Sequence, residues 1–244
     1  MQKNIASFEY KAELTSDNSP TLRLPPTWEP MHALDGAFTE TQYIYAPTVA
    51  SALDTGLNPR IISIGLGLGY NEILIACEAL IKDKPGVCID SYESVDALRL
   101  FFKNWLAHPE DLPQDIHSIY NQILELYAQK YQLEPQRIRS FLQTLLNNHQ
   151  LLLLGAISEE TTVTPSHGIL FDAFSSKSSP ELWTEEFLKE FLRKASSDVC
   201  YLSTYASKGT LHRSLKFNGF SSEKKPGFGV KRESTFAYKG NQTR

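Results

Sequence analysis

The sequence predicts an α/β protein in which helices cover an open, mostly parallel sheet, and three observations support this class. An apolar, largely β-branched run at residues 61–64 leads through three alternate glycines into apolar residues at helical spacing. Short apolar runs then alternate with longer helical stretches, as strands and crossover helices do in such sheets. Near the end, residues 220–224 and 233–238 predict a hairpin, which adds an antiparallel pair to the otherwise parallel strands.

Length and composition are those of a soluble globular protein. The 244 residues are 41% hydrophobic, enough for one large α/β domain with a small insertion. The apolar run at residues 151–154 is far shorter than a membrane span, and no apolar signal core follows Met1, so we expect a cytoplasmic protein that does not enter a membrane. The three cysteines are far apart and match no zinc pattern, so we expect no metal.

The chain before the glycines predicts a small N-terminal unit, residues 1–53. Residues 10–14 alternate as an edge strand does, and residues 21–24 follow a turn and pair back to form a hairpin. A helix over about residues 39–53 then leads into the main domain. We assign residues 54–244 to that domain.

A helical insertion is predicted inside the main domain at about residues 96–150. Its apolar residues recur at helical spacing, and two proline-containing breaks divide it. A crossover between parallel strands needs only one helix, so the extra helices indicate an insertion that caps the sheet edge. Further strands are expected at residues 150–155, 168–174 and 199–205.

The glycine loop indicates a nucleoside ligand. Gly65, Gly67 and Gly69 form a G-x-G-x-G pattern, which departs from the dinucleotide fingerprint at its third glycine and favours a nucleoside without a pyrophosphate. S-adenosylmethionine fits this description. Its ribose needs an acidic partner at the end of the next strand, about 20 residues downstream, and Glu93 stands there. The alternative is a structural turn, which any α/β domain can contain.

Two further acidic residues are candidates for the same site. Asp172 closes an apolar strand, and ligands of open parallel sheets bind at the carboxyl ends of strands, where the strand order reverses. Glu40, near the start of the leading helix, can face the ligand from the side. Both residues also have structural explanations, because Asp172 can cap a turn and Glu40 can complement the helix dipole.

The formal net charge of −4 conceals an asymmetry along the chain. Residues 193–244 carry 11 basic and three acidic side chains, a local net charge of +8, which leaves −12 for the rest. A basic end on an acidic protein suggests a phosphate-binding face. A solvated, lysine-rich surface explains the same charge without a partner.

Four stretches resemble the S-adenosylmethionine-dependent methyltransferase half of MnmC-type bifunctional tRNA enzymes and its stand-alone relatives. They are Glu29-Pro30-Met31-His32 with Gly36-Ala37, Gly65 to Glu72, Asp172-Ala173-Phe174-Ser175 with Pro180-Glu181-Leu182-Trp183, and Lys225 to Glu233. Many methyltransferases share the glycine loop, whereas the last two stretches together are specific. The resemblance covers residues 29–240 and implies a class I methyltransferase fold, with a Rossmann-like seven-stranded sheet and a terminal antiparallel strand pair.

The resemblance also implies an activity. Such relatives methylate the primary amine of an aminomethyl group on the wobble uridine of tRNA, so we expect an enzyme that uses S-adenosylmethionine and binds the anticodon arm. No flavin-dependent oxidoreductase half follows Arg244, so we expect a separate enzyme to supply the aminomethyl group.

These patterns assign residues to the expected site. The cofactor site is expected to combine the loop, the start of its helix and two acids, namely Gly65, Leu66, Gly67, Tyr70, Asn71, Glu93 and Glu40. Asp172 is the expected catalytic residue, because a carboxylate can accept an N–H bond from the amine, orient its lone pair and stabilise the ammonium that forms. Phe174 is expected beside the transferred methyl group.

Substrate contacts are expected from aromatic and basic residues. Phe174 and Trp183 are candidates for stacking on an unstacked base, although packing in an apolar-periodic stretch is the simpler explanation for Trp183. Lys231 and Arg232 are expected to contact phosphates of the anticodon arm.

Three departures from the family pattern leave other functions open. Ala156 stands where an acidic adenine partner is usual, which leaves Glu159 or Glu160 as substitutes. Ser63 replaces a frequent acid before the glycines, and Ser179-Pro180 replaces the usual Asn-Pro. The alternatives are an aminopropyltransferase, a methyltransferase for a protein or small molecule, and a non-catalytic RNA-binding domain. The basic C-terminal end argues against the first, which needs an acidic polyamine channel.

Overall fold

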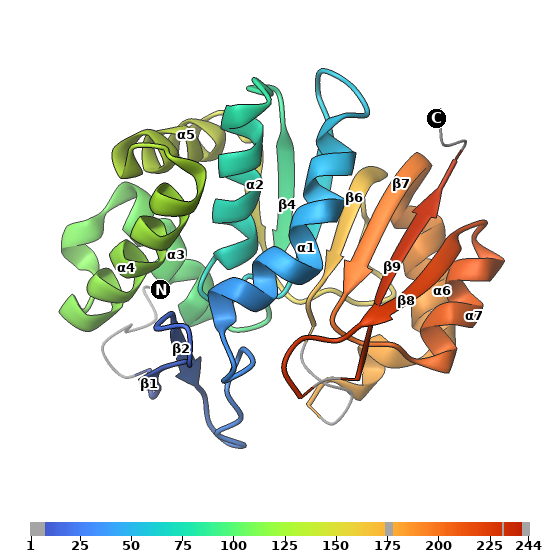
Figure 1. The fold of residues 1–244 in the computed structure, drawn as a ribbon, viewed down its shortest axis with the longest axis horizontal. Helices are drawn as coiled ribbons and strands as arrows, with labels where there is room; N and C mark the ends of the chain where they lie inside the picture. Colours follow the sequence, from blue (N-terminus) through green and yellow to red (C-terminus); the bar gives the residue numbers. More distant parts are fainter. Residues whose placement is uncertain (1–7, 174–177, 231, 241–244) are drawn as a thin grey trace.

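A seven-stranded sheet with helices on both faces forms the body of the molecule (Figure 1). The computed structural model describes residues 8–173, 178–230 and 232–240. Five strands are parallel, namely β3 (Arg60–Ile64), β4 (Cys88–Tyr92), β5 (Leu151–Leu154), β6 (Ser166–Phe171) and β7 (Ser196–Thr204). The antiparallel pair at one end consists of β9 (Glu233–Lys239), which joins β7, and β8 (Ser221–Pro226), which joins β9.

The strand order is β5-β4-β3-β6-β7-β9-β8, so the order reverses between β3 and β6. The chain first runs outward from β3 to β5 and then returns to the other side of β3. Parallel sheets bind ligands outside the carboxyl ends of the strands at such a reversal. The predicted α/β fold with its terminal antiparallel pair is confirmed, and the reversal falls at the glycine loop.

Two helices cover each face of the sheet near its centre, with α1 and α2 side by side on one face and α6 and α7 on the other (Figure 1). Their bounds are α1 (Ala37–Leu53), α2 (Tyr70–Ile81), α6 (Glu185–Ala195) and α7 (Gly209–Phe217), and the short helix η3 (Pro180–Trp183) precedes α6. The helix predicted over about residues 39–53 is α1, which begins two residues earlier.

The central strand β3 is buried on both faces, as its apolar run predicted. Successive side chains of a strand point to opposite faces. Ile61 accordingly packs in the core formed with α1 and α2, whereas Ile62 and Ile64 pack in the core formed with α6 and α7. Ser63 lies on the same face as Ile61 and is fully buried.

The predicted helical insertion follows β4. It consists of α3 (Asp96–Ala107), η2 (Pro109–Asp111), α4 (Gln114–Tyr131) and α5 (Pro135–Asn147). Large side chains such as Trp105, Tyr120 and Tyr127 are fully buried and join the core of the α1–α2 face. The insertion therefore extends the hydrophobic core beside α2 (Figure 1).

The N-terminal hairpin is present as β1 (Lys11–Leu14) and β2 (Pro20–Arg23), an antiparallel pair. Leu22 of β2 packs in the core of the α1–α2 face, and Tyr70 at the start of α2 donates its hydroxyl to the carbonyl of Pro20 at 2.8 Å. These contacts tie the hairpin to the main sheet domain. The domain boundary at residue 53 stays a prediction.

Within the described part of the chain, no helix combines the length and apolarity needed to cross a bilayer. The three cysteines are free thiols; Cys77 and Cys200 are buried and Cys88 is half-buried.

Candidate functional site

The glycine loop connects β3 to α2 in a conformation that favours glycine at each alternate position. Gly65, Gly67 and Gly69 have φ angles of 92°, 52° and 76°. A Cβ on Gly65 would overlap the backbone carbonyl of Asp172, and one on Gly69 would overlap the ring of Phe102. These two glycines are thus required by the packing of the protein itself.

Gly67 has a different role in the loop. A Cβ there would meet only the terminal methyl group of Met31, at 2.9 Å, and Gly67 lines a cavity at the carboxyl ends of the parallel strands. Its backbone N–H donates to Oε2 of Glu93 at 3.1 Å. Gly65, which is half-buried, and Gly67, which is buried, both line this cavity, so the loop presents backbone there without a side chain in the way of a ligand.

Glu93 follows β4 and is held against the glycine loop. Its other oxygen, Oε1, accepts from the backbone N–H of Val95 at 2.9 Å, and the side chain is 4% exposed. Burial raises the pKa of Glu93, and the N–H groups of Val95 and Gly67 oppose that increase. The structure thus brings Glu93 next to the loop, as predicted from its place after the strand.

Asp172 follows β6 and is held by two neutral donors. The hydroxyl of Tyr45 donates to Oδ1 at 2.6 Å, and the side-chain amide of Asn71 donates to Oδ2 at 3.1 Å. Tyr45 is almost wholly buried in α1, and this burial together with the charge of Asp172 raises the pKa of its phenol well above 10. Tyr45 therefore remains a donor, and the carboxylate of Asp172 is fixed in orientation.

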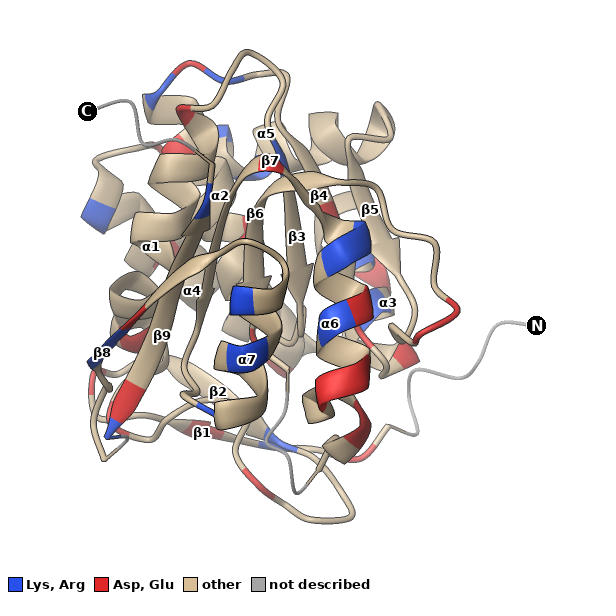
Figure 2. Cartoon of the chain, turned by 90° about the vertical axis from the view of Figure 1, so that its right-hand side faces the viewer, with Lys and Arg blue, Asp and Glu red and all other residues tan. Residues whose placement is uncertain are grey.

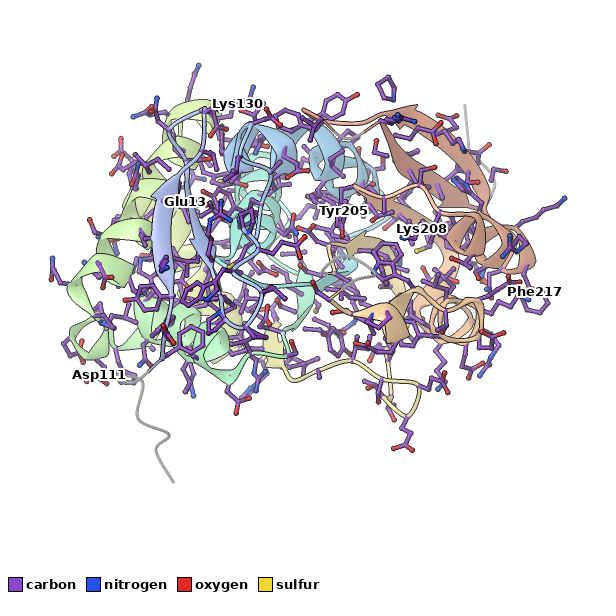
Figure 3. The ribbon with its side chains drawn as sticks, turned by 90° about the horizontal axis from the view of Figure 1, so that it is seen from below. Glu13, Asp111, Lys130, Tyr205, Lys208 and Phe217 are labelled. Atoms are coloured by element: carbon purple, nitrogen blue, oxygen red, sulfur yellow. The ribbon has the colours of Figure 1, made fainter. Side chains whose placement is uncertain are left out.

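A cavity of about 270 Å³ lies between the glycine loop, Asp172 and the segment that precedes α1. Its lining includes four carboxyl side chains, which are Glu29, Glu40, Glu93 and Asp172. None of the described residues that line it is Lys or Arg. Figure 3, which views the carboxyl ends of the parallel strands, labels another lining residue, Tyr205, near the middle of this face. The cavity favours cationic ligands.

A second, smaller hollow of about 70 Å³ adjoins this cavity. The two share Gly65, Glu93 and Ala173, so Glu93 stands between them. The small hollow is lined further by Tyr92, Ser94, Ala156, Ile157 and Leu182 and by one more acid, Glu181. Together the two spaces form an elongated site with an acid near its middle.

The predicted cofactor residues divide into two groups. Gly65, Gly67, Glu93 and Glu40 line the main cavity, where Oε2 of Glu40 accepts from the backbone N–H of Ala33 at 3.0 Å. The others do not line it: Leu66 is 2% exposed in the core, Tyr70 donates to the carbonyl of Pro20, and Asn71 acts on the site through Asp172. The start of α2 thus serves the site mainly by positioning other groups.

The predicted substrate residues lie farther out. Trp183 is 4% exposed and packs edge-on against Phe171, with ring centroids 5.1 Å apart, so it presents no open face to a base. Arg232 is exposed at the base of the β8–β9 loop. Phe174 and Lys231 lie outside the described residues.

Sequence reasoning missed several lining residues. Thr41 and Tyr45 are four positions apart on α1 and line the cavity from one helix face, as does Glu40 beside them. Tyr205, after β7, also lines it and donates its hydroxyl to the carbonyl of Ala173 at 2.9 Å. The helical spacing of Thr41 and Tyr45 was the available signal, but the sequence does not show which helix face meets the ligand.

One group in the described chain has side chains close enough to share a metal ion. The ligand atoms of His108, which precedes η2, and of Glu110 and Asp111 on η2 lie within 4.8 Å of one another, and all three residues are exposed. Exposed groups of this kind are common without a metal, and none of the three lines the cavity.

The family model for S-adenosyl-L-methionine-dependent methyltransferases matches residues 114–240, just over half of the chain. The chain belongs to this family. A crystal structure of MnmC2 from Aquifex aeolicus superimposes on the methyltransferase with a TM-score of 0.66 and 24% identity, covering 95% of this chain and 70% of that chain, and shows the same fold.

Curated relatives match most of this methyltransferase. An uncharacterized protein of Methanocaldococcus jannaschii is 29% identical over 92% of this chain and 58% of its own length. The tRNA 5-methylaminomethyl-2-thiouridine biosynthesis bifunctional protein MnmC of Aromatoleum aromaticum is 29% identical over 83% of this chain, and that of Ralstonia nicotianae is 24% identical over 89%. The chain spans only 31% and 34% of these two bifunctional proteins. The predicted likeness to the MnmC methyltransferase is confirmed.

The site fits the methyl donor of this family, S-adenosylmethionine. The backbone of Gly65 and Gly67 at the cavity wall suits the approach of a ligand, and Glu93 stands between the two hollows, where it would hold the ribose hydroxyls. The acidic main cavity would hold the sulfonium and the amino-acid end, and the smaller, mostly apolar hollow beside Ile157 and Leu182 would hold the adenine.

Glu72, on the first turn of α2, is a buried acid beneath the glycine loop. Its side chain is 0% exposed, and Oε1 accepts from Ser91 Oγ at 2.6 Å. Burial raises its pKa to about 7, against the opposing effect of the Ser91 and Ser63 hydroxyls. In the folded protein, this carboxyl therefore retains its proton to a higher pH than in the unfolded chain.

We predict that Glu72→Gln stabilises the protein at high pH. Between pH 4.5, the ordinary pKa of a glutamate, and about 7, its pKa in the folded protein, the folded state holds a proton that the unfolded state releases, so the free energy of unfolding falls as pH rises. This difference between the two pKa values corresponds to about 3 kcal/mol of unfolding free energy. A glutamine at this position does not titrate, so the variant keeps its stability as pH rises. Urea denaturation without ligand measures the free energy of unfolding at pH 5 and pH 8. The value for the variant, relative to wild type, should be higher at pH 8 than at pH 5.

The exposed Glu125→Gln on α4 is the control for this comparison, with little change expected at either pH. Equal differences between Glu72→Gln and wild type at both pH values would show that Glu72 is ionised in the folded protein throughout this range.

Proposed function

We propose that this methyltransferase transfers a methyl group from S-adenosylmethionine to the primary amine of an aminomethyl group on the wobble uridine of tRNA. The observation that carries the proposal is the acidic cavity in which Asp172 is held by Tyr45 and Asn71. An amine is the nucleophile that such a cavity attracts, because alkylamines are cationic at neutral pH. Relatives that are 29% and 24% identical carry the name of the tRNA 5-methylaminomethyl-2-thiouridine enzyme.

In this mechanism Asp172 positions the amine. When bound, S-adenosylmethionine supplies an electrophilic methyl group on a sulfonium. One lone pair of the Asp172 carboxylate accepts an N–H bond from the neutral amine, which turns the nitrogen lone pair toward the methyl carbon. The N–C bond forms as the S–C bond breaks, the carboxylate stabilises the new ammonium, and its proton then leaves to water.

The same carboxylate favours the protonated amine, so the site must also accept the proton that makes the amine reactive. Tyr45 remains protonated because of its raised pKa and does not serve as that base. The cavity is open to solvent at Glu29, which is exposed and accepts from Ser178 Oγ at 2.9 Å. Water that enters on this side is the proposed proton acceptor.

The β8–β9 loop is the proposed contact for the tRNA backbone. It lies against the segment that forms the cavity wall, because Val230 N–H donates to Oδ2 of Asp35 at 3.3 Å and Tyr43 donates its hydroxyl to the carbonyl of Pro226 at 3.1 Å. Arg232 and Lys225 are exposed beside this loop. An anticodon loop in the cavity would place its phosphates near these two cations.

Much of the basic charge at the C-terminal end is neutralised locally. Lys224 pairs with Glu233, Arg213 with Glu185, and Arg193 with Glu190. Figure 2 shows the result on α6, where basic and acidic bands lie on the same helix. The proposed phosphate contact is therefore confined to the loop and does not extend over this whole face.

An aminopropyltransferase is the second candidate, because an acidic cavity also suits a polyamine. Incubation with labelled S-adenosylmethionine and bulk tRNA containing 5-aminomethyl-uridine, followed by nucleoside analysis, tests the proposed function. We expect label in 5-methylaminomethyl-uridine. Label in no nucleoside, with S-adenosylmethionine bound, would contradict a tRNA substrate. Transfer of an aminopropyl group from the decarboxylated cofactor to putrescine would establish the second candidate.

Replacing Asp172 by Asn should lower the turnover rate much more than the affinity for S-adenosylmethionine. The variant keeps the shape of the side chain but loses the charge that stabilises the ammonium, so we expect kcat to fall by about 100-fold or more. S-adenosylmethionine should bind more weakly by about tenfold or less, because one carboxylate of the cavity is lost, so kcat is measured at saturating cofactor and the affinity by calorimetry. The exposed Asp111→Asn on η2 is the control. An Asp172→Asn protein that binds the cofactor normally and turns over at the wild-type rate would refute the role of this carboxylate.

Binding to tRNA should depend steeply on salt. Each phosphate contact releases counterions, so Arg232→Ala should weaken tRNA binding and reduce the slope of log K against log[salt] by about 1. Filter binding at several salt concentrations measures both quantities. Lys216→Ala on α7 is the control and should change neither. Binding to tRNA that is insensitive to salt would contradict the proposed contact between Arg232 and the phosphates.

A further inference from the structure

The carboxyl group of Glu72 has a buried oxygen with no partner. Oε1 accepts from Ser91 Oγ at 2.6 Å, whereas Oε2 is buried and makes no hydrogen bond to any described residue. Glu72 does not line the cavity. A buried, half-satisfied carboxylate is costly unless it is protonated or a positive charge lies nearby.

The surroundings of Glu72 contain hydroxyl groups and further acids. Ser63 on β3 and Ser91 on β4 are register partners beneath it, and Ser63 Oγ also lacks a hydrogen bond of standard geometry. Tyr120 on α4 faces the same space with a buried, unpartnered hydroxyl, and the Glu72 charge helps to raise its pKa, after burial. Asp172 opposes the ionisation of Glu72 from the end of β6. None of these neighbours is basic.

Glu72 is also linked to the reaction site, because it is next to Asn71 in the sequence and because the charge of Asp172 acts on its ionisation. Its neighbour on α2, Asn71, donates the hydrogen bond to Asp172 Oδ2, so the two carboxyl groups flank one helix turn. The cavity on the other side of Asp172 has the acidic lining that suits a cation. A sulfonium bound there would supply the positive charge that the space around Glu72 lacks.

We propose that Glu72 is a charge-balancing residue, protonated while the cavity is free of a cation and ionised when a sulfonium occupies it. In this step the O–H bond of the carboxyl group breaks, the proton passes to solvent, and the carboxylate remains beneath the glycine loop. After methyl transfer the donor is a neutral thioether, so Glu72 takes up a proton again. The exchange favours S-adenosylmethionine over S-adenosylhomocysteine and assists release of the product. It rests on the cofactor of the family and does not depend on the proposed tRNA substrate.

The test compares the affinities of wild type and Glu72→Gln for the two ligands at pH 6 and pH 8, by calorimetry without tRNA. At pH 8, we expect Glu72→Gln to bind S-adenosylmethionine three- to tenfold more weakly than wild type, and S-adenosylhomocysteine equally well. At pH 6 the free protein holds the Glu72 proton more firmly, so its loss offsets part of the gain and the two proteins should differ less than at pH 8. Titration of groups on the ligands affects the affinities of both proteins equally. The difference in affinity between wild type and the variant therefore reports on Glu72 alone.

Glu78→Gln is the matched control. Glu78 lies on the same helix and accepts from the hydroxyl of Tyr131 at 2.9 Å, away from the cavity lining. This variant should leave the affinities for both ligands unchanged. A Glu72→Gln protein that weakens both ligands by the same factor at both pH values would show a purely structural role and overturn the proposal.

Two further measurements keep the proposal testable if Glu72→Gln folds poorly. Wild type at pH 7 should release more protons on binding S-adenosylmethionine than the titration of the free ligand explains, as measured in buffers of different ionisation enthalpy. Ser91→Ala removes the hydroxyl that favours the ionised carboxyl and should weaken S-adenosylmethionine selectively at pH 7.5. No excess proton release, or equal loss for both ligands in Ser91→Ala, would contradict it.

Discussion

The placement of the Asp172 carboxylate is the constraint on which the site depends. Its backbone N–H donates to the carbonyl of Ile64 at 3.0 Å, which extends the pairing of β6 with β3 to the point where the glycine loop begins. The absence of a Cβ on Gly65 lets the Asp172 carbonyl lie against the loop. Tyr45 from α1 and Asn71 from α2 then fix the side chain, so four elements converge on one carboxylate.

The acids around the cavity are stabilised by backbone donors. Glu93 accepts backbone N–H bonds from Gly67 and Val95, which oppose the rise in its pKa caused by burial, and Glu40 accepts one from Ala33. The carboxyl groups of the cavity are therefore held in place before any ligand arrives. Such preorganisation suits a reaction in which a sulfonium loses its charge while an amine gains one.

Hydrophobic patterning predicted most of the fold, because strands and helices bury faces whose period is visible in the sequence. The strand at residues 61–64, the insertion and the terminal pair were all placed in this way. The strand expected over residues 168–174 covers Ser166–Phe171 instead. Asp172 still donates its N–H to Ile64, and its carbonyl then packs against Gly65 of the glycine loop. The end of the strand thus depends on a contact between residues that are far apart in the sequence.

The site was predictable in part. Glu93 and Asp172 follow apolar strands, and the topology of a parallel sheet brings such positions together. The glycine motif, by contrast, does not show where neighbouring side chains point: Leu66 and Tyr70 face the core, and the ring of Trp183 packs on Phe171. Tyr45 escaped notice because its role depends on the rotation of α1 against the sheet.

The central claim is that S-adenosylmethionine binds across the two hollows, with its ribose at Glu93 and its sulfonium facing Asp172. A crystal structure of the protein with S-adenosylhomocysteine tests this most directly. We expect the ribose hydroxyls within hydrogen-bonding distance of Glu93 and the sulfur directed toward the space beside Asp172 and Tyr45. A ligand bound elsewhere, or a sulfur directed away from Asp172, would contradict the account.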